Sequence, residues 1–226
     1  MSKKPDKAGK DPVSHAHRSV RADAQRNTDA LLKAAMAVFA TSGVDAPVRE
    51  IAAKARVGLG TVYRHFPKRS DLIAAVFRHE VDACADAAPV LAAEHAPAEA
   101  LSKWIERYMD FIATKRGLAS ALHSGDPAFE LLPAYFETRL KPALRSLLDP
   151  AEAAGEVRAQ VDPEELLRAV ARLSMSAHDD GPAPARRMVG LLLDGLRYGA
   201  SRSQDRPSRH KLKPRAEASL ARRSKE

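Results

Sequence analysis

One segment of the chain, residues 51–72, restricts the possible folds more than any other. Its pattern predicts two short helices joined by a tight turn, with a third helix starting just beyond Pro67. Val62 and Phe66 lie four residues apart, so they share one face of the second helix. The side chains left on the outer face of that helix are polar: Thr61, Tyr63, Arg64 and His65. Such a face suits a DNA groove, although a solvated helical hairpin in an unrelated domain would show the same pattern.

This segment and the helix before it resemble the DNA-binding domain of TetR-family transcriptional regulators. The resemblance extends from Arg26 to Val76. The matching residues are Leu31-Leu32, Ala35, Val38-Phe39, Gly43-Val44, Ile51-Ala52, Ala55, Val57, Gly60-Thr61, Tyr63-Arg64-His65-Phe66-Pro67, Arg69 and Leu72. The resemblance implies an all-helical homodimer whose N-terminal domain binds DNA. It also implies a C-terminal domain that dimerises and binds a small molecule.

Two positions depart from the pattern of the family. Arg56 occupies the turn position that usually holds glycine, and a left-handed backbone there would cost a non-glycine residue about 1 kcal/mol. Gly58 and Leu59 stand where many relatives have serine and lysine. The polar contacts of those side chains are therefore absent, and we expect the glycine backbone to approach DNA closely.

We expect the helix from Leu59 to Phe66 to lie in the major groove, with basic residues around it on phosphates. Thr61, Tyr63 and His65 are the candidates for base readout, together with an apolar contact from Leu59 to a thymine methyl group. The predicted DNA-binding residues are Arg26, Pro47, Val48, Arg49, Gly58, Leu59, Gly60, Thr61, Tyr63, Arg64, His65, Lys68 and Arg69.

Composition favours a helical protein with a sizeable core. Hydrophobic residues make up 45% of the 226 residues and aromatic residues 5%, and the abundance of alanine and leucine favours helices over sheets. A single cysteine, Cys84, cannot form an internal disulfide. The sequence shows neither a signal peptide nor the ~18 consecutive apolar residues of a membrane span, so we expect a cytoplasmic, nucleoid-associated protein. One cysteine and eight scattered histidines give no metal-site spacing, and no cofactor is predicted.

Charge divides the chain into four parts. The net charge is +4 over residues 1–21, +4 over 22–70, −6 over 71–200 and +6 over 201–226. We predict, in that order, a disordered basic arm, a helix-turn-helix DNA-binding domain, a regulatory and dimerisation domain, and a disordered basic tail. Basic ends on an acidic body are typical of a polyanion-binding protein, whereas tails that only aid solubility are the alternative.

The apolar periodicity predicts an all-α fold of about nine helices. The first is expected to begin near Asn27 or Thr28, either of which can cap it. The last two helices, which start near Pro163 and Pro184, are apolar with small residues interspersed. Their pattern alone favours core packing within one chain, but the family resemblance implies pairing with their symmetry mates as a four-helix bundle. The expected dimer residues are Leu166, Val170, Leu173, Met188, Leu192, Gly195, Leu196 and Gly199.

Aromatic residues recur in the middle of the chain and could line an apolar cavity with a few polar groups, although each one alone is more typical of core packing. The predicted ligand-binding residues are Trp104, Tyr108, Phe111, Ile112, His123, Phe129, Tyr135, Phe136, Met175 and His178.

Together these patterns predict a ligand-responsive, homodimeric transcriptional regulator. We expect a repressor that binds a palindromic operator in double-stranded DNA and is released by a small apolar or aromatic effector. A DNA-binding protein without an effector, either a constitutive regulator or a nucleoid binder, is the first alternative. An enzyme is the second. His123 with Asp126, and His178 with Asp179, could act as acid–base pairs, but no nucleophile, metal or cofactor motif accompanies them, so no catalytic residue is predicted.

Overall fold

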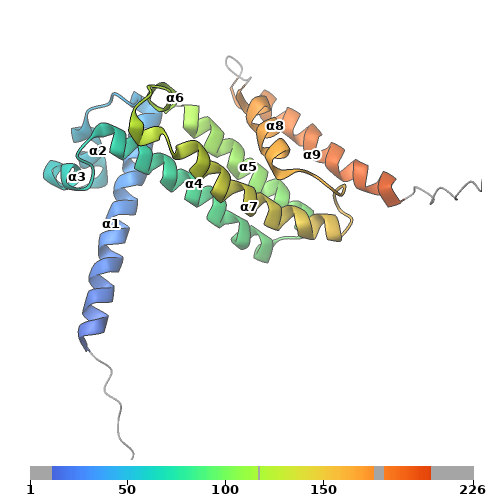
Figure 1. The fold of residues 1–226 in the computed structure, drawn as a ribbon, viewed down its shortest axis with the longest axis horizontal. Helices are drawn as coiled ribbons and strands as arrows, with labels where there is room; N and C mark the ends of the chain where they lie inside the picture. Colours follow the sequence, from blue (N-terminus) through green and yellow to red (C-terminus); the bar gives the residue numbers. More distant parts are fainter. Residues whose placement is uncertain (1–11, 117, 176–180, 205–226) are drawn as a thin grey trace, which may run out of the picture.

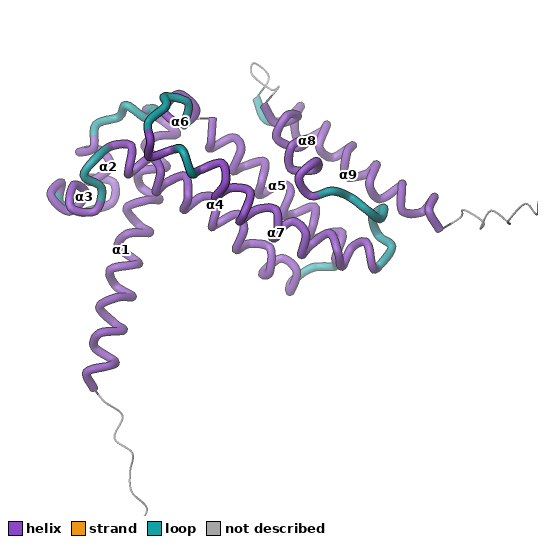
Figure 2. Tube along the Cα trace, viewed as in Figure 1, coloured by secondary structure: helices purple, strands orange, loops and turns teal. Residues whose placement is uncertain are grey.

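The computed structural model describes residues 12–116, 118–175 and 181–204, and every regular element in these ranges is a helix (Figure 2). The elements are α1 (Pro12–Ser42), α2 (Val48–Ala55), α3 (Leu59–His65), α4 (Arg69–Glu94), α5 (Pro97–Arg116), α6 (Ala119–Leu122), the 3₁₀ helix η1 (Pro127–Phe129), α7 (Leu132–Ala153), α8 (Pro163–Met175) and α9 (Ala183–Gln204). The predicted all-α fold is confirmed over this part of the chain. None of these described helices is both long and apolar enough to span a membrane.

Helix α1 is longer than predicted, because it begins at Pro12 rather than near Asn27. The segment before Asn27 contains several alanine and arginine residues, which favour helix. Gln25 also donates a hydrogen bond to Asp29 (3.0 Å), one turn further along. The predicted disordered arm, residues 1–21, is therefore partly helical, and its remainder lies outside the described residues. The low apolar content of this segment does not prevent it from forming a helix. This end of α1 projects away from the other helices (Figure 1).

Apolar packing holds α1, α2 and α3 together as an N-terminal head. Leu31 and Phe39 on α1, Ile51 on α2 and Val62 on α3 are at most 1% exposed. They form one cluster with Leu72 at the start of α4. Because each buried side chain of this size contributes about 1.5–3 kcal/mol, this cluster fixes the head against α4.

Helices α4, α5 and α7 pack side by side and form the body of the protein (Figure 1). Ile105 of α5 and Leu140 of α7 are fully buried between them. Trp104 is also fully buried, and its indole N–H donates a hydrogen bond to the Cys84 carbonyl oxygen (2.9 Å). Burial raises the pKa of the Cys84 thiol to about 12, so this cysteine is inert at neutral pH. Helix α4 therefore belongs to both the head cluster and the body and connects the two.

Helices α8 and α9 pack together at the end of the body farthest from α3 (Figure 1). Asp162 caps α8 as predicted, because its carboxylate accepts hydrogen bonds from the Glu164 and Glu165 backbone N–H groups (2.8 and 2.9 Å). These bonds lower the pKa of Asp162. Arg197 of α9 donates to the Ala98 carbonyl oxygen of α5 (3.2 Å), which ties α9 to the body. Helix α9 extends to Gln204, into the predicted tail, and the rest of that tail lies outside the described residues.

Candidate DNA interface and effector cavity

The turn between α2 and α3 is left-handed at Arg56, with φ of 57° and ψ of 39°. The Arg56 N–H donates to the Ala53 carbonyl oxygen (3.1 Å), and the Val57 N–H donates to that of Ala52 (3.0 Å). These bonds satisfy carbonyls at the end of α2 that would otherwise have no partner. The sequence left open whether the turn is altered or the strain is tolerated, and the backbone at Arg56 is left-handed, so its conformational cost of about 1 kcal/mol is tolerated.

Helix α3 turns its apolar side inward and its polar side outward, as the sequence predicted. Val62 is 1% exposed, whereas Tyr63 is 51% and Leu59 is 44% exposed. Arg64 and His65 are exposed as well, and Thr61 is half-buried. The phenol of Tyr63 and the aliphatic side chain of Leu59 are therefore exposed to solvent beside the polar side chains of Arg64 and His65. A face with these exposed side chains differs from the surface of a core helix, which would be buried.

The glycines at the start of α3 leave its backbone accessible. Gly58 has an ordinary φ of −69°, so its conformation does not require glycine. A side chain at Gly60 would meet no atom within 4 Å. The fold of the chain therefore does not require glycine at either position. The missing side chains leave room for another molecule to approach the backbone.

Arg69 departs from its expected role as a phosphate contact. Its guanidinium donates to the carbonyl oxygens of Val44 and Ala46, the latter at 2.8 Å, and so fastens the α1–α2 connection to the start of α4. Next to it, the Lys68 backbone N–H donates to the Asp71 carboxylate (3.1 Å) and closes the start of α4. Lys68 itself is exposed, so it is the better placed of the two basic residues to contact a phosphate.

The other predicted DNA-binding residues lie on one end of the molecule, on α1, α2 and α3 or the turns between them. Val48 is half-buried. The exposed members of the set, besides those on α3, are Arg26, Pro47, Arg49 and Gly58.

A cavity of about 310 Å³ lies among α5, α6, α7 and α8. Five predicted ligand-binding residues line it: Tyr108, Ile112, His123, Phe136 and Met175. Eight other residues complete the wall: Lys115, Ala119, Glu137, Lys141, Glu164, Leu167, Arg168 and Ala171. An apolar chamber with charged groups in its wall is a typical site for a small organic ligand.

Among the described residues, four other predicted ligand-binding residues do not line this cavity: Trp104, Phe111, Phe129 and Tyr135. Trp104 is fully buried in the core, and Phe111 is buried behind Tyr108 and Phe136, with ring centroids about 6 Å apart (6.1 and 6.0 Å). Phe129 lines a neighbouring cavity of about 250 Å³. The sequence pattern marked these residues as apolar, but helical spacing alone does not distinguish a core face from a cavity wall. His178 lies outside the described residues.

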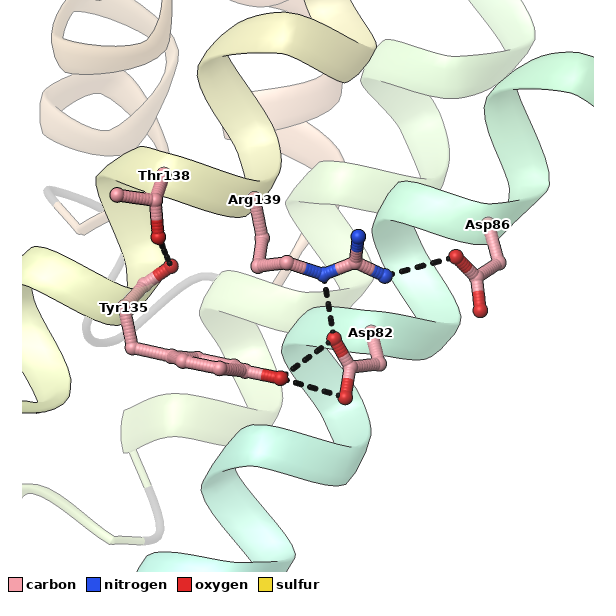
Figure 3. Close-up of polar contacts among 5 residues, drawn as sticks. All are labelled: Asp82, Asp86, Tyr135, Thr138 and Arg139. Carbon is pink, nitrogen blue, oxygen red and sulfur yellow. Dashed lines mark hydrogen bonds and ion pairs between the residues drawn. The ribbon is translucent and has the colours of Figure 1, made fainter.

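Tyr135 was also predicted to bind ligand, but it faces α4 instead (Figure 3). Its hydroxyl donates to both carboxylate oxygens of Asp82 (2.8 and 2.7 Å). Arg139, one turn later on α7, bridges Asp82 and Asp86 of α4 (2.7 and 2.9 Å). Partial burial and the bond to Asp82 raise the pKa of Tyr135. We call Asp82, Asp86, Tyr135 and Arg139 the polar clasp, because they fasten α7 to α4.

Comparison with known proteins identifies the family. Residues 31–76 match the family model of bacterial regulatory proteins of the tetR family, and residues 96–198 match that of the SbtR-like transcriptional regulator C-terminal domain. The chain is also similar to a TetR transcriptional regulator of known structure from Streptomyces coelicolor, with 40% identity, a TM-score of 0.66, and coverage of 75% of this chain and 97% of that one. The chain belongs to the TetR family of transcriptional regulators.

Two further TetR-family structures are similar to the chain. A regulator from Mycobacterium vanbaalenii is 36% identical with a TM-score of 0.61, over 79% of this chain and 99% of that one. LfrR from Mycobacterium smegmatis, solved in complex with proflavine, is 26% identical with a TM-score of 0.51, over 78% and 95%. No match was found among curated protein sequences. Membership of the family makes this a DNA-binding transcription regulator with a helix-turn-helix head, as predicted.

The predicted dimer residues of this TetR-family chain divide into two groups. Leu166, Val170 and Leu196 are buried within the chain, at 5%, 0% and 8% exposure. They pack on the inner faces of α8 and α9, so for these three residues core packing within one chain is the role that the structure gives. Leu173 and Leu192 are half-buried, and Gly199 lies outside the residues whose burial is described.

The outer face of α9 is apolar and exposed. Met188 is 47% exposed, Leu191 63% and Tyr198 66%, and they follow one another at helical spacing together with Gly195. A side chain at Gly195 would meet no atom within 4 Å. Met188 and Gly195 were predicted as dimer residues, whereas Leu191 and Tyr198 were not. Both follow Met188 at intervals of three or four residues, so helical spacing would have placed them on the same face.

The charged residues of the cavity wall were also missed. Glu137 and Lys141 on α7, and Glu164 and Arg168 on α8, are each four residues apart, which is the usual spacing of a solvated helix face. Lys141 donates to Glu164 across the two helices (3.0 Å), and Arg168 pairs with the same carboxylate. Only the approach of α7 to α8 brings these groups to one cavity, and that approach cannot be read from either helix alone.

Proposed function

We propose that this regulator is a homodimeric repressor that binds a palindromic operator and leaves it when a small molecule fills the cavity among α5, α7 and α8. The observation that carries the proposal is the polar clasp. It ties α7, a wall of the cavity, to α4, which begins in the head that reads DNA.

The reading surface would be the exposed side of α3, with Tyr63 at its centre. Tyr63, Arg64 and His65 are polar groups in solvent, and Leu59 is an apolar group that suits a thymine methyl. Arg49 and Lys68 flank this helix, where they can contact phosphates and set the position of the head on the duplex.

The dimer would form through the exposed apolar face of α9, together with α8. A two-fold axis there would place two copies of α3 on the same side of DNA, about 34 Å apart or a multiple of that distance. The face is rich in large apolar side chains and carries Gly195, where a neighbouring helix backbone can approach closely.

The response would run from the cavity to the head through the clasp. Phe136 and Glu137 line the cavity, and Tyr135 is their neighbour on α7. A ligand that displaces Phe136 would rotate or shift α7 and, through Tyr135 and Arg139, move α4. A ligand that prefers the moved state by about 1–3 kcal/mol would weaken the free energy of operator binding by up to the same amount. LfrR, a TetR-like regulator similar to this chain, was solved in complex with proflavine, which supports a small-molecule effector for this chain as well.

The test is operator selection followed by mutation of the reading helix. Sequences bound by the full-length protein are selected from random DNA, and affinities for the selected operator and for scrambled DNA are compared at fixed salt. Tyr63→Ala is expected to reduce the ratio of these affinities by roughly tenfold or more, while light scattering shows the same dimer. An unchanged ratio in Tyr63→Ala would remove α3 from the reading surface. A wild-type protein without any operator preference would favour a nucleoid binder instead.

A further inference from the structure

One basic residue in the wall of the cavity has no acidic partner among the described residues. Lys115 stands near the end of α5, where it lines both the 310 Å³ cavity and the neighbouring 250 Å³ cavity. Its ammonium nitrogen lies 5.9 Å from the ring centroid of Phe77 and 5.8 Å from that of Phe136. Two aromatic rings thus hold the charge at the boundary between the two chambers.

The other acidic side chains around the cavity either pair with a basic residue or face solvent. Glu164 is paired with both Lys141 and Arg168, and Glu137 is exposed to solvent. Among the described residues, no carboxylate lies within 4.0 Å of the Lys115 ammonium. Burial lowers the pKa of Lys115, which is the expected effect on an ammonium that has left water without meeting an anion.

The charge of Lys115 also restricts what the cavity can hold. A cationic ligand would be repelled, and the aromatic faces that could attract it, those of Phe77 and Phe136, are already occupied by the ammonium. A neutral apolar ligand would remove the remaining water from Lys115 without supplying a partner, which costs free energy. An anion avoids both costs, because it forms a charge-assisted hydrogen bond with the ammonium.

We propose that the effector of this cavity is an amphipathic organic anion, with a carboxylate or a similar group on Lys115 and an apolar body against Tyr108, Ile112 and Leu167. The assignment rests on the proposed function, because it names the ligand class of the same cavity. It narrows the small apolar or aromatic effector predicted from the sequence to one with an acidic head.

The test uses one carbon frame with three charges: 4-phenylbutanoate, 4-phenylbutanamide and 4-phenylbutylamine. Binding of each to the full-length protein is measured by calorimetry at neutral pH. The carboxylate is expected to bind roughly 10- to 100-fold more tightly than the amide, and the amine more weakly than either. An amide or amine that binds as tightly as the carboxylate would overturn the proposal, as would a carboxylate that fails to bind at millimolar concentration. This comparison uses the unmodified protein, so it does not depend on the folding of any variant.

Three variants then locate the anion. Lys115→Met is expected to bind carboxylate and amide equally, and Lys115→Arg to retain the preference for the carboxylate. Lys103→Met is the matched control, because Lys103 lies on the same helix but outside the cavity and pairs with Glu99 (3.6 Å). A preference for the carboxylate that persists in Lys115→Met would overturn the role of Lys115.

Release of the operator is measured separately by fluorescence anisotropy. Carboxylate binding that depends on Lys115 without release of DNA would contradict the proposed effector response while supporting the anion site. Release of DNA by the neutral or cationic probe alone would support the effector response and overturn the anion site.

Discussion

The turn between α2 and α3 is left-handed at Arg56, a residue that is not glycine. Relatives usually place glycine there, and the backbone of this chain adopts the same conformation with an arginine. The conformation is held by hydrogen bonds back to Ala52 and Ala53 and by the packing of α2 and α3 on the head core. The head therefore tolerates a local cost because its apolar core determines how the two helices meet.

Arg56→Gly is expected to stabilise the protein. Glycine removes the steric cost of about 1–2 kcal/mol but adds freedom to the unfolded chain, so a net gain of about 0.5 kcal/mol remains. Thermal unfolding should show a rise in Tm of about 1–2 °C. Ala53→Gly is the matched control: this exposed position lies inside α2, where glycine should lower the stability by about 1 kcal/mol. Equal shifts in both variants would contradict a left-handed cost at Arg56.

Lys115 makes the stability of the protein depend on pH, and the sign of this dependence follows from the lowered pKa of Lys115. The folded protein disfavours the ammonium, so the unfolded chain binds more protons between the folded and the unfolded pKa, and stability rises with pH there. Lys115→Met lacks this cost. Its free energy of unfolding should exceed that of the wild type at neutral pH, and the difference should narrow as the pH rises through the folded pKa. Denaturant unfolding across the alkaline range measures both curves, and a difference that widens with pH would contradict the burial of an unpaired charge.

At the scale of elements, the sequence predicts which segments are helical better than it predicts what each helix faces. The inner and outer sides of α3 were predicted correctly, because Val62 and Phe66 lie four residues apart and both pack against the core. Helix α1 was predicted too short, since low apolar content does not prevent helix formation. Tyr135 was assigned to the cavity, yet it meets Asp82, a residue 53 positions earlier in the chain. Such a long-range polar contact has no signal in local spacing.

The polar clasp is the element-scale feature that links cavity and head, and a double variant tests it. Tyr135→Phe with Arg139→Gln removes the hydrogen bonds and ion pairs between α7 and α4. Binding of 4-phenylbutanoate by calorimetry should change by less than about threefold, because neither residue lines the cavity. The reduction in operator affinity that this probe causes should shrink by roughly fivefold or more.

Arg145→Gln is the control for the clasp. Arg145 also lies on α7, but it pairs with Asp149 of the same helix (3.5 Å), so its loss breaks no bond to α4. The control should respond to the probe as the wild type does. An undiminished response in the double variant would mean that the coupling runs through apolar packing between the helices instead.

At the scale of the whole molecule, the helix-turn-helix head and the exposed apolar face of α9 lie at opposite ends. The head is basic and carries α3, whereas the exposed apolar face of α9 lies at the far end of the body (Figure 1). The general division into a DNA-binding and a regulatory part was predictable from net charge and from the family resemblance. The side of α9 that remains exposed was not, because it depends on which side packs against α8 and α5.

Gly195→Arg is expected to give monomers. The arginine would place a charge in the middle of the exposed apolar face of α9, where it would be desolvated on dimerisation. Light scattering should report half the mass of the wild type, and operator affinity should fall by roughly 100-fold or more, as one head loses its partner. Ala134→Arg adds the same side chain at an exposed position of α7 and should remain dimeric. A dimer of unchanged stability in Gly195→Arg would place the interface elsewhere.

Hydroxyl-radical footprinting of the full-length wild-type protein on its selected operator tests the proposed mode of DNA binding most directly. Two heads related by a two-fold axis predict two protected segments on one face of the duplex, related by the dyad of the palindrome. The centres of these segments should lie about 10 base pairs apart, or a multiple of this. A single protected segment, or continuous protection without a dyad, would contradict the dimeric reading of a palindrome.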